Sequence, residues 1–192
     1  MNKKLNPSIV PKVLPVVEPD NVKAKYHHPH LPQVGVGVPG GGSLLLMISP
    51  VKTGKSTIIS NLLLNDSFFG QEYFDDVQII SNTIKNDVTS RFLNRAFNVY
   101  DYYSDSIIDG LIDRQKSFEK KDQPQTALIL DDCLGSIKRE SKINHICSRY
   151  RHFNIKLLVI SSQKFKGSVS PVVRANATDV IVGSPFPNMK EL

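Results

Sequence analysis

The chain has 192 residues, 40% of them hydrophobic, and its aromatic fraction of 8% includes no Trp. We therefore expect one globular α/β domain with some irregular sequence, and a core of Ile, Leu and Val as in buried parallel sheets. The net charge of +6 is divided into +3 over residues 1–42, −4 over 43–132 and +7 over 133–192. The basic C-terminal third fits either an anionic partner such as nucleic acid or an ordinary solvated basic face.

The cysteines and the apolar runs exclude several classes of protein. Cys133 and Cys147 form no Cys-x-x-Cys pair, so neither a zinc site nor a disulfide framework is indicated, and two thiols fit a reducing compartment. The clearest apolar runs, 44–48 and 157–160, are too short to span a bilayer and predict buried strands. The basic residues near the N-terminus are followed by no apolar stretch, so no signal peptide is expected.

Residues 1–42 are rich in proline and glycine and are expected to form an arm or linker without a packed core. Two forms are considered: a disordered leader, or a polyproline or edge-strand peptide at Val13–Val17 that docks on a partner. His27, His28 and His30 form a small cluster in this arm. A proline interrupts their spacing and no cysteine or acidic ligand is near, so a metal site is not favoured.

From Ser43 onwards, apolar patterns predict alternating strands and helices. Strands are expected at 43–49, 76–81, 98–103, 125–130, 156–161 and 179–182. Helices are expected at 55–64, 104–121, 137–150 and 169–176. In the second of these, Ser104 or Asp105 is the expected N-cap, and apolar residues as far as Phe118 recur at helical spacing. Such alternation predicts parallel strands joined by crossover helices.

A phosphate loop follows the first predicted strand and opens the first predicted helix. It fits the pattern G-x-x-x-x-G-K-[ST] except at its first position, and it consists of Ser49, Pro50, Val51, Lys52, Thr53, Gly54, Lys55, Ser56 and Thr57. In such a loop the backbone N–H groups face the phosphates, and the second glycine lets the main chain approach them closely. We expect Lys55 to reach the β- and γ-phosphates of ATP and Ser56 to ligate Mg²⁺. Ser49 stands where the pattern has its first glycine, and we expect a modest cost in backbone conformational energy if the φ of this residue must be positive. The flanking strand and helix argue against a chance Gly-Lys-Ser.

Two carboxylates, Asp131 and Asp132, follow the predicted strand 125–130. Asp131 fits a role in supporting Mg²⁺, because an acid at a strand tip faces the phosphate loop in this kind of fold. Asp132 is the candidate that orients the attacking water or accepts its proton. Many hydrolysing P-loop proteins have Glu at that position, and Asp is one methylene shorter. The alternative interpretation is a solvated pair of acids at a turn.

The apolar strand 156–161 leads through Ser162 into Gln163. P-loop ATPases with an additional strand between the two motif strands use a polar residue here to sense the γ-phosphate, and an amide can donate to phosphate while it accepts from water. Kinase-like and GTPase-like P-loop proteins need no such residue. The alternative interpretation of Gln163 is a polar residue at a strand end that satisfies the hydrogen bonds of a turn. The predicted fold is a P-loop NTPase three-layer α/β/α sandwich with a mostly parallel central sheet, of the additional-strand, RecA-like type.

With these three motifs in order, the chain resembles the FtsK–HerA superfamily, and within it the genome-packaging ATPases of poxviruses, giant viruses and virophages. The Asp-Asp ending is familiar in that group. Two further sequence blocks are also familiar in that group: an Arg-His-x-Asn step within Ser148–Asn154 and an Arg-x-Asn step within Val172–Asn176. The resemblance covers about residues 43–185, and we assign 43–192 to the ATPase domain. Because relatives often continue with further strands, a fragment and a minimal version are both considered.

The resemblance implies an ATPase that uses ATP and Mg²⁺ to move double-stranded DNA into a preformed capsid. It implies a homo-oligomeric ring of five or six subunits and contact with a capsid or portal-vertex protein. It further implies a location in the host cell cytoplasm at viral assembly sites or in association with the virion. No membrane span is expected.

In a ring, a neighbouring subunit supplies an arginine that stabilises charge developing on the γ-phosphate. Arg174 and Arg151 are the candidates, with Arg149 third, and DNA-phosphate contacts or surface salt bridges are their alternative roles. Lys164 and Lys166 follow the γ-phosphate sensor closely, which suggests that they couple it to a loop that grips DNA.

Three other functions are weighed against the packaging motor. A conjugation or chromosome pump of the same superfamily usually brings membrane segments or extra domains, and this sequence shows neither. A small-molecule kinase needs an acceptor pocket and an Arg-bearing lid, and no lid stretch is found. A nucleotide switch or scaffold would not need the acidic pair at the end of strand 125–130.

Overall fold

A computed structural model of the chain describes residues 41–65, 68–69, 72–84, 91–134 and 141–183. The strands are β1 (Ser43–Ile48), β2 (Asp76–Ser81), β3 (Asn98–Tyr100), β4 (Thr126–Asp131), β5 (Ile155–Ser162) and β6 (Asp179–Val182). The helices are α1 (Lys55–Leu64), α2 (Arg91–Ala96), α3 (Asp105–Lys116), α4 (Lys142–Arg149), α5 (Pro171–Asn176) and the 3-10 helix η2 (Tyr150–Phe153).

The strands form one parallel sheet in the order β3-β2-β4-β5-β1-β6. All of them therefore end at the same side of the sheet, here called the carboxyl edge, and begin at the opposite amino edge. β5 lies between β1, which leads into the phosphate loop, and β4, which ends in the acidic pair. The predicted parallel α/β fold with an additional strand between the two motif strands is confirmed.

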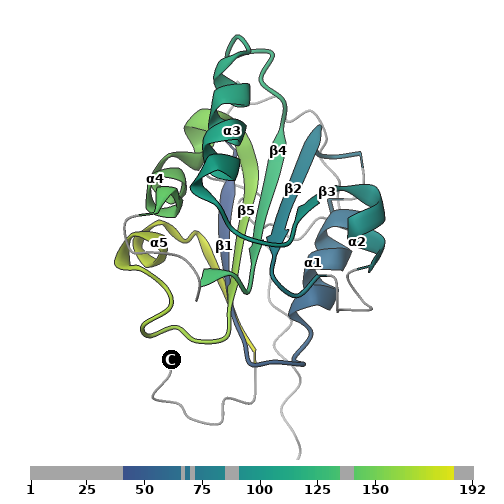
Figure 1. Ribbon diagram of the computed structural model, residues 1–192, viewed down its shortest axis with the longest axis vertical. Helices are drawn as coiled ribbons and strands as arrows, with labels where there is room; N and C mark the ends of the chain where they lie inside the picture. Colours follow the sequence, from purple (N-terminus) through teal and green to yellow (C-terminus); the bar gives the residue numbers. More distant parts are fainter. Residues whose placement is uncertain (1–40, 66–67, 70–71, 85–90, 135–140, 184–192) are drawn as a thin grey trace, which may run out of the picture.

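Helices cover both faces of the sheet, which gives the three layers seen in Figure 1. Leu45 and Met47 of β1 face the layer that contains α1, whereas Leu44, Leu46 and Ile48 face the layer of α3, α4 and α5. Burial on both faces explains why β1, β4 and β5 are almost continuous apolar runs rather than alternating patterns.

Several element boundaries differ from the sequence predictions. The helix expected at 104–121 is capped by Ser104, the first of the two expected N-caps, because its Oγ accepts from the Ser106 N–H at 3.3 Å. The helix ends at Lys116, however, where the Ser117 hydroxyl donates to the Arg114 carbonyl at 2.7 Å and competes with the helical pattern. Phe118 is consequently exposed by 41% and not part of the apolar face.

Other corrections follow from capping and from short segments. α5 begins at Pro171 rather than Val169, because Ser170 accepts from the Val173 N–H at 3.3 Å and a proline at the first helical position suits a helix start. α4 begins at Lys142, and part of the predicted 137–150 helix lies outside the described residues. The predicted strand 98–103 ends at Tyr100, and α2 was not predicted.

The arm predicted at 1–42, with its histidine cluster, lies outside the described residues except for its last two glycines. Gly42 is buried, and its carbonyl accepts a hydrogen bond from the Tyr150 hydroxyl at 3.3 Å. This glycine therefore belongs to the folded domain. Within the part of the chain that the structure describes, no helix has the length and apolar character needed to cross a membrane.

The open surroundings of Gly110 in α3 give a test of the fold. An ideal Cβ at Gly110 would meet no atom within 4 Å, and glycine inside a helix is less stable than alanine by about 0.5–1 kcal/mol. We therefore expect Gly110→Ala to raise the free energy of unfolding, measured with urea, by about 0.5–1 kcal/mol. Gly42→Ala is the contrasting variant, because its Cβ would lie 3.0 Å from the Ile155 carbonyl oxygen. A loss of stability in Gly110→Ala would contradict the position of α3.

Candidate functional site

The phosphate loop connects β1 to α1 at the carboxyl edge. Gly54 is the N-cap of α1 and has a φ of 93°, in the left-handed region that favours glycine. Since glycine offers no capping side chain, the first-turn N–H groups of α1 have no side-chain acceptor from their own N-cap, as in anion-binding helix starts. The Lys55 ammonium donates to the Ser49 carbonyl at 2.7 Å and to the Pro50 carbonyl at 3.0 Å. The lysine is thus folded back over its own loop.

Ser49 fits the first position of the loop without the freedom of a glycine. Its φ is not positive; within the loop the left-handed residues are Lys52, with a φ of 63°, and Gly54. The Ser49 hydroxyl is hydrogen-bonded to Thr53, whose Oγ1 donates to the Pro50 carbonyl at 2.6 Å. The serine is buried against Gly183, the residue just beyond β6. Gly183 has no Cβ that would collide with the serine side chain. Ser49 therefore does not carry the backbone strain that a positive φ would impose on a serine.

Asp131, the last residue of β4, is held between two neighbouring strands. It is only 6% exposed. Its Oδ1 accepts from the Ser161 hydroxyl of β5 at 2.5 Å, and its Oδ2 accepts from the Ser81 hydroxyl of β2 at 3.0 Å. Burial raises the pKa of the Asp131 carboxyl and so does the Asp132 charge, whereas the two hydroxyls and the Lys55 charge lower it. The Lys55 charge therefore acts on this carboxyl.

Asp132 leaves the strand with a φ of 51°, which is uncommon for a residue other than glycine. Its N–H donates to both the carbonyl and the hydroxyl of Ser161, at 3.3 and 3.2 Å. Its carboxylate accepts from the Gln163 amide at 2.5 Å. The end of β5 thus fixes both the backbone and the side chain of Asp132, and it brings together the acid and the amide that the sequence analysis singled out.

The grouped side chains fit a magnesium nucleotide by their chemistry. Mg²⁺ prefers hard oxygen ligands such as carboxylate and hydroxyl, and Asp131 with Ser56 offers both at the carboxyl edge. The Asp131 oxygens together have about four acceptor positions, of which the two serine hydroxyls use one each. Both oxygens therefore retain acceptor capacity for a cation or its bound water.

The arginines that the sequence analysis named lie in different places. Arg174, in α5, stacks over the Phe165 ring at 5.2 Å, and Phe165 follows Gln163 closely. Arg151, in η2 just before β5, stacks over Tyr150 at 5.1 Å and lies beside Gly42, at the amino edge. Of these three arginines, Arg174 is the one that stacks on a ring in the segment that follows Gln163. Arg149, at the end of α4, is exposed.

The Arg-His-x-Asn block that supported the resemblance has contacts at the amino edge. Asn154 has a φ of 51° and its side-chain amide donates to the Gln123 carbonyl at 2.7 Å, which ties the start of β5 to the start of β4. Tyr150 is buried in the layer of α3 and α4 and contacts Gly42. This block therefore ties the amino edge of the sheet together, at the side opposite the phosphate loop.

Three residues at the site, Ser81, Ser161 and Gly183, are not among those that the sequence predicts. The two serines each occupy a strand end or near-end beside Asp131, and a polar residue closing an apolar strand is the signal that could have found them. In the sequence analysis, a polar residue at the end of an apolar strand points to Gln163 alone. Gly183 had no local signal, since its role depends on the neighbouring Ser49.

Both cysteines are buried thiols. Burial raises the pKa of Cys133, next to the acidic pair, to about 12, and the Asp131 charge adds to this effect. Burial likewise raises the pKa of Cys147 to about 12. Burial therefore disfavours the thiolate form of both sulfurs near neutral pH.

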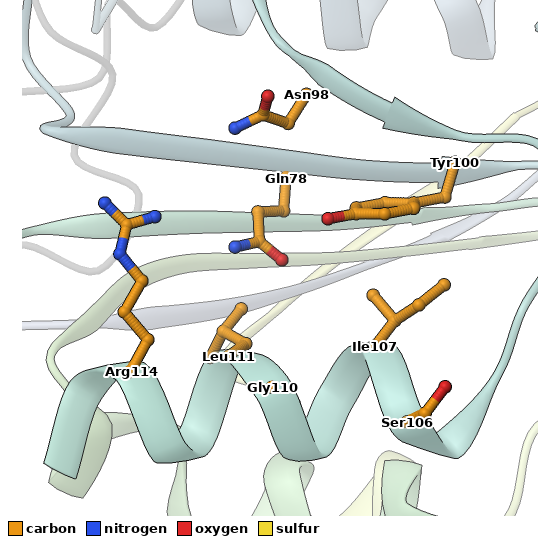
Figure 2. A pocket seen from close by; sticks show the side chains of 8 residues that line it. All are labelled: Gln78, Asn98, Tyr100, Ser106, Ile107, Gly110, Leu111 and Arg114. Atoms are coloured by element: carbon orange, nitrogen blue, oxygen red, sulfur yellow. The ribbon is translucent and has the colours of Figure 1, made fainter. Parts of the chain in front are cut away.

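A hollow of about 460 Å³ lies elsewhere, between α3 and the strands β2 and β3. Figure 2 shows its lining side chains, among them Gln78, Tyr100 and Arg114. Arg114 donates to the Asp76 carboxylate at 3.0 Å, and Gln78 donates to the same oxygen at 3.1 Å. The hollow is on the face of the sheet opposite α1 and does not belong to the phosphate site.

Two curated viral proteins are similar in sequence. Uncharacterized protein 075L of Invertebrate iridescent virus 6 is 29% identical over 146 residues, which are 74% of this chain and 54% of that protein. Uncharacterized protein 088R of Invertebrate iridescent virus 3 is 27% identical over 146 residues, 74% of this chain and 53% of that protein. The chain spans about half the length of these relatives. No protein-family model matches it.

Two solved structures share the fold. The genome packaging NTPase B204 from Sulfolobus turreted icosahedral virus 2, in complex with ATP-gammaS, has a TM-score of 0.54 and 16% identity, with 78% of each chain covered. The cytoplasmic domain of EssC has a TM-score of 0.56 and 15% identity, and the match covers 78% of this chain and 34% of that one. At these identities the likeness shows the fold.

The contact between Ser49 and Gly183 gives a test of the loop. An ideal Cβ on Gly183 would overlap the Ser49 hydroxyl and lie 2.8 Å from the Ser49 Cβ, and overpacking of this kind costs about 1–3 kcal/mol. We expect Gly183→Ala to lower the free energy of unfolding by about 1–3 kcal/mol in the wild-type background. In a Ser49→Gly background only the Cα remains, at 3.6 Å, so the same substitution should cost little.

A double-mutant cycle measured by urea unfolding separates the two backgrounds. An equal penalty for Gly183→Ala with Ser49 and with Gly at that position would show that the two residues are not in contact.

Proposed function

We propose that the chain is an ATPase that uses ATP hydrolysis to move double-stranded DNA and package a viral genome into a preformed capsid. The observation that carries the proposal is the grouping at the carboxyl edge. There the loop lysine Lys55 begins α1, just after β1. The buried Asp131 closes β4, and the hydrogen-bonded pair of Asp132 and Gln163 follows the ends of β4 and β5. β5 pairs with both β1 and β4, so these groups meet at one edge of the sheet.

The loop binds the triphosphate through backbone N–H groups at the start of α1 and through Lys55. In the structure this ammonium donates to two backbone carbonyls. A phosphate is a stronger, charged acceptor, so we infer that Lys55 leaves the carbonyls and donates to the β- and γ-phosphates when ATP binds.

Ser56 and Asp131 would hold Mg²⁺, which neutralises negative charge on the phosphates when it is bound. Asp132 accepts a proton from the attacking water or orients it, and Gln163 keeps the Asp132 carboxylate in place. When a γ-phosphate binds, the Gln163 amide donates a hydrogen bond to it, either in place of its hydrogen bond to Asp132 or in addition to it. This makes Gln163 the sensor of the nucleotide state.

The segment after Gln163 offers a route from the nucleotide to DNA. Lys164 and Lys166 are exposed there, and Phe165 between them lies under the Arg174 guanidinium. We infer that a change in the Gln163 contact moves this segment and the two ammonium groups, which bind DNA phosphates. The net charge of +7 over residues 133–192 agrees with an anionic partner.

The assembly belongs to the proposal as well. It is a ring of five or six copies around the DNA, in contact with a capsid or portal-vertex protein, in the host cell cytoplasm at assembly sites or in association with the virion. Arg174 is the favoured arginine for a neighbour's γ-phosphate, because Arg151 lies at the amino edge. The similarity to iridescent virus proteins and to the fold of a viral genome packaging NTPase supports this reading. The EssC likeness is compatible with another pump of the FtsK–HerA type.

The direct test of the proposal is steady-state ATP hydrolysis with and without long double-stranded DNA. We expect Mg²⁺-dependent hydrolysis that DNA stimulates, and loss of both basal and stimulated rates in Lys55→Ala, because the phosphates lose their ammonium partner. Hydrolysis that is indifferent to DNA would count against the translocase and favour a nucleotide switch. Phosphate transfer to a small-molecule acceptor would favour a kinase.

The DNA route is tested with the double variant Lys164→Ala, Lys166→Ala. We expect DNA stimulation to fall, and the slope of log affinity for DNA against log salt concentration to decrease by about one per lysine. Lys120→Ala with Lys121→Ala is the matched control, since those lysines are exposed in the turn before β4, at the amino edge. Equal salt slopes in both double variants would contradict the route.

A further inference from the structure

Asp131 receives one hydroxyl from the strand on each side of it. Ser81 closes β2, Asp131 closes β4, and Ser161 lies one residue before the end of β5. The three are in register, with Ser81 opposite Asp131 and Asp131 opposite Ser161. They therefore form a single row across three adjacent strands, here called the Ser–Asp–Ser row.

The register also fixes the face on which the row lies. Met47 of β1 is opposite Ser161, and Met47 packs in the layer that contains α1. In-register residues of parallel strands project from the same face of a sheet. The Ser–Asp–Ser row consequently faces the layer of α1, the helix whose first turn carries Lys55 and Ser56.

The hydroxyls limit the rotation of a carboxylate that is nearly buried. Ser81 is 1% exposed and Ser161 is fully buried, so water does not compete for these hydrogen bonds. One serine binds each carboxylate oxygen. Two donors on opposite sides fix the plane of the carboxylate, which a single donor would leave free to turn.

Ser161 acts on the second acid too. Its hydroxyl donates to Asp131 and accepts from the Asp132 N–H at 3.2 Å, and its carbonyl accepts from the same N–H at 3.3 Å. The left-handed conformation of Asp132 is therefore held by the residue that also orients Asp131. One side chain sets the geometry between the two carboxylates.

We propose that Ser81 and Ser161 are positioning residues that orient Asp131 toward a divalent cation bound with the nucleotide, and that Ser161 also sets the position of Asp132. This inference rests on the proposed function, since it concerns the same site. Partners that orient a metal ligand typically change metal affinity by about 10–100-fold when they are removed. A role limited to satisfying a buried carboxylate would change stability alone.

The same sheet supplies a matched control at its other edge. Ser43, at the start of β1, is 1% exposed and donates to the Asp179 carboxylate at 2.5 Å. This pair has the chemistry of Ser161 and Asp131 but lies at the amino edge, away from the phosphate loop. Ser43→Ala therefore removes a half-buried serine–aspartate hydrogen bond without touching the proposed site.

The experiment compares Ser161→Ala, Ser81→Ala and Ser43→Ala in the full chain. Binding of a fluorescent ATP analogue is measured in EDTA, and Mn²⁺ affinity in the presence of nucleotide is measured by electron paramagnetic resonance. We expect the Mn²⁺ dissociation constant to rise about 10-fold or more in Ser161→Ala and Ser81→Ala, with metal-free nucleotide binding unchanged. Ser43→Ala should leave both quantities unchanged. Urea unfolding of each variant reports any loss of stability.

The outcomes separate the two proposals. If the wild type binds Mn²⁺ with nucleotide, and Ser161→Ala and Ser81→Ala bind it as well as Ser43→Ala does, the positioning role is wrong while the nucleotide site stands. If the wild type binds no nucleotide, or binds it equally well after Lys55→Ala, the proposed function itself fails. Should Ser161→Ala unfold, Ser81→Ala decides the question, because it removes a hydroxyl from the other side of the same carboxylate.

Discussion

The position of β5 between β1 and β4 is the constraint on which the site depends. Ser161 reaches Asp131, and Gln163 reaches Asp132, because β5 is the hydrogen-bonded neighbour of the strand that carries both acids. The same strand accepts the Ser49 N–H through the Ser162 carbonyl at 3.0 Å, at the start of the phosphate loop. The end of β5 therefore links the loop, the acidic pair and Gln163.

Burial and charge at this edge oppose each other in a way that suits a cation site. Asp131 is almost inaccessible, and burial disfavours its charged form. Two hydroxyls and the Lys55 charge favour that form. Lys55 meanwhile rests on two backbone carbonyls of its own loop. The Asp131 carboxylate, held by its two hydroxyl donors, would need little rearrangement when a cation binds, which is the basis of electrostatic preorganisation. Lys55, in contrast, would exchange its two carbonyl acceptors for phosphates.

The sequence predicted the fold better than the details of the site, for physical reasons. Buried parallel strands are continuous apolar runs, and β2 and β6 were predicted at the observed bounds. The helix expected to reach residue 121 ends at Lys116, where the Ser117 hydroxyl donates to the Arg114 carbonyl, and Phe118 is exposed although its spacing fits the apolar face. Gln163 could be foreseen from an apolar strand with a polar end. The roles of Ser81, Ser161 and Gly183 depend on which strands are neighbours and in which register, and a linear pattern does not contain that information.

The central claim is that the residues at the carboxyl edge form one magnesium nucleotide site, and a crystal structure with Mg²⁺ and a non-hydrolysable ATP analogue tests it most directly. We expect a triphosphate across the loop, the Lys55 ammonium moved from the Ser49 and Pro50 carbonyls to the phosphates, and the cation between Ser56 and Asp131. Nucleotide bound elsewhere, or Lys55 still donating to its two carbonyls beside a bound triphosphate, would contradict it.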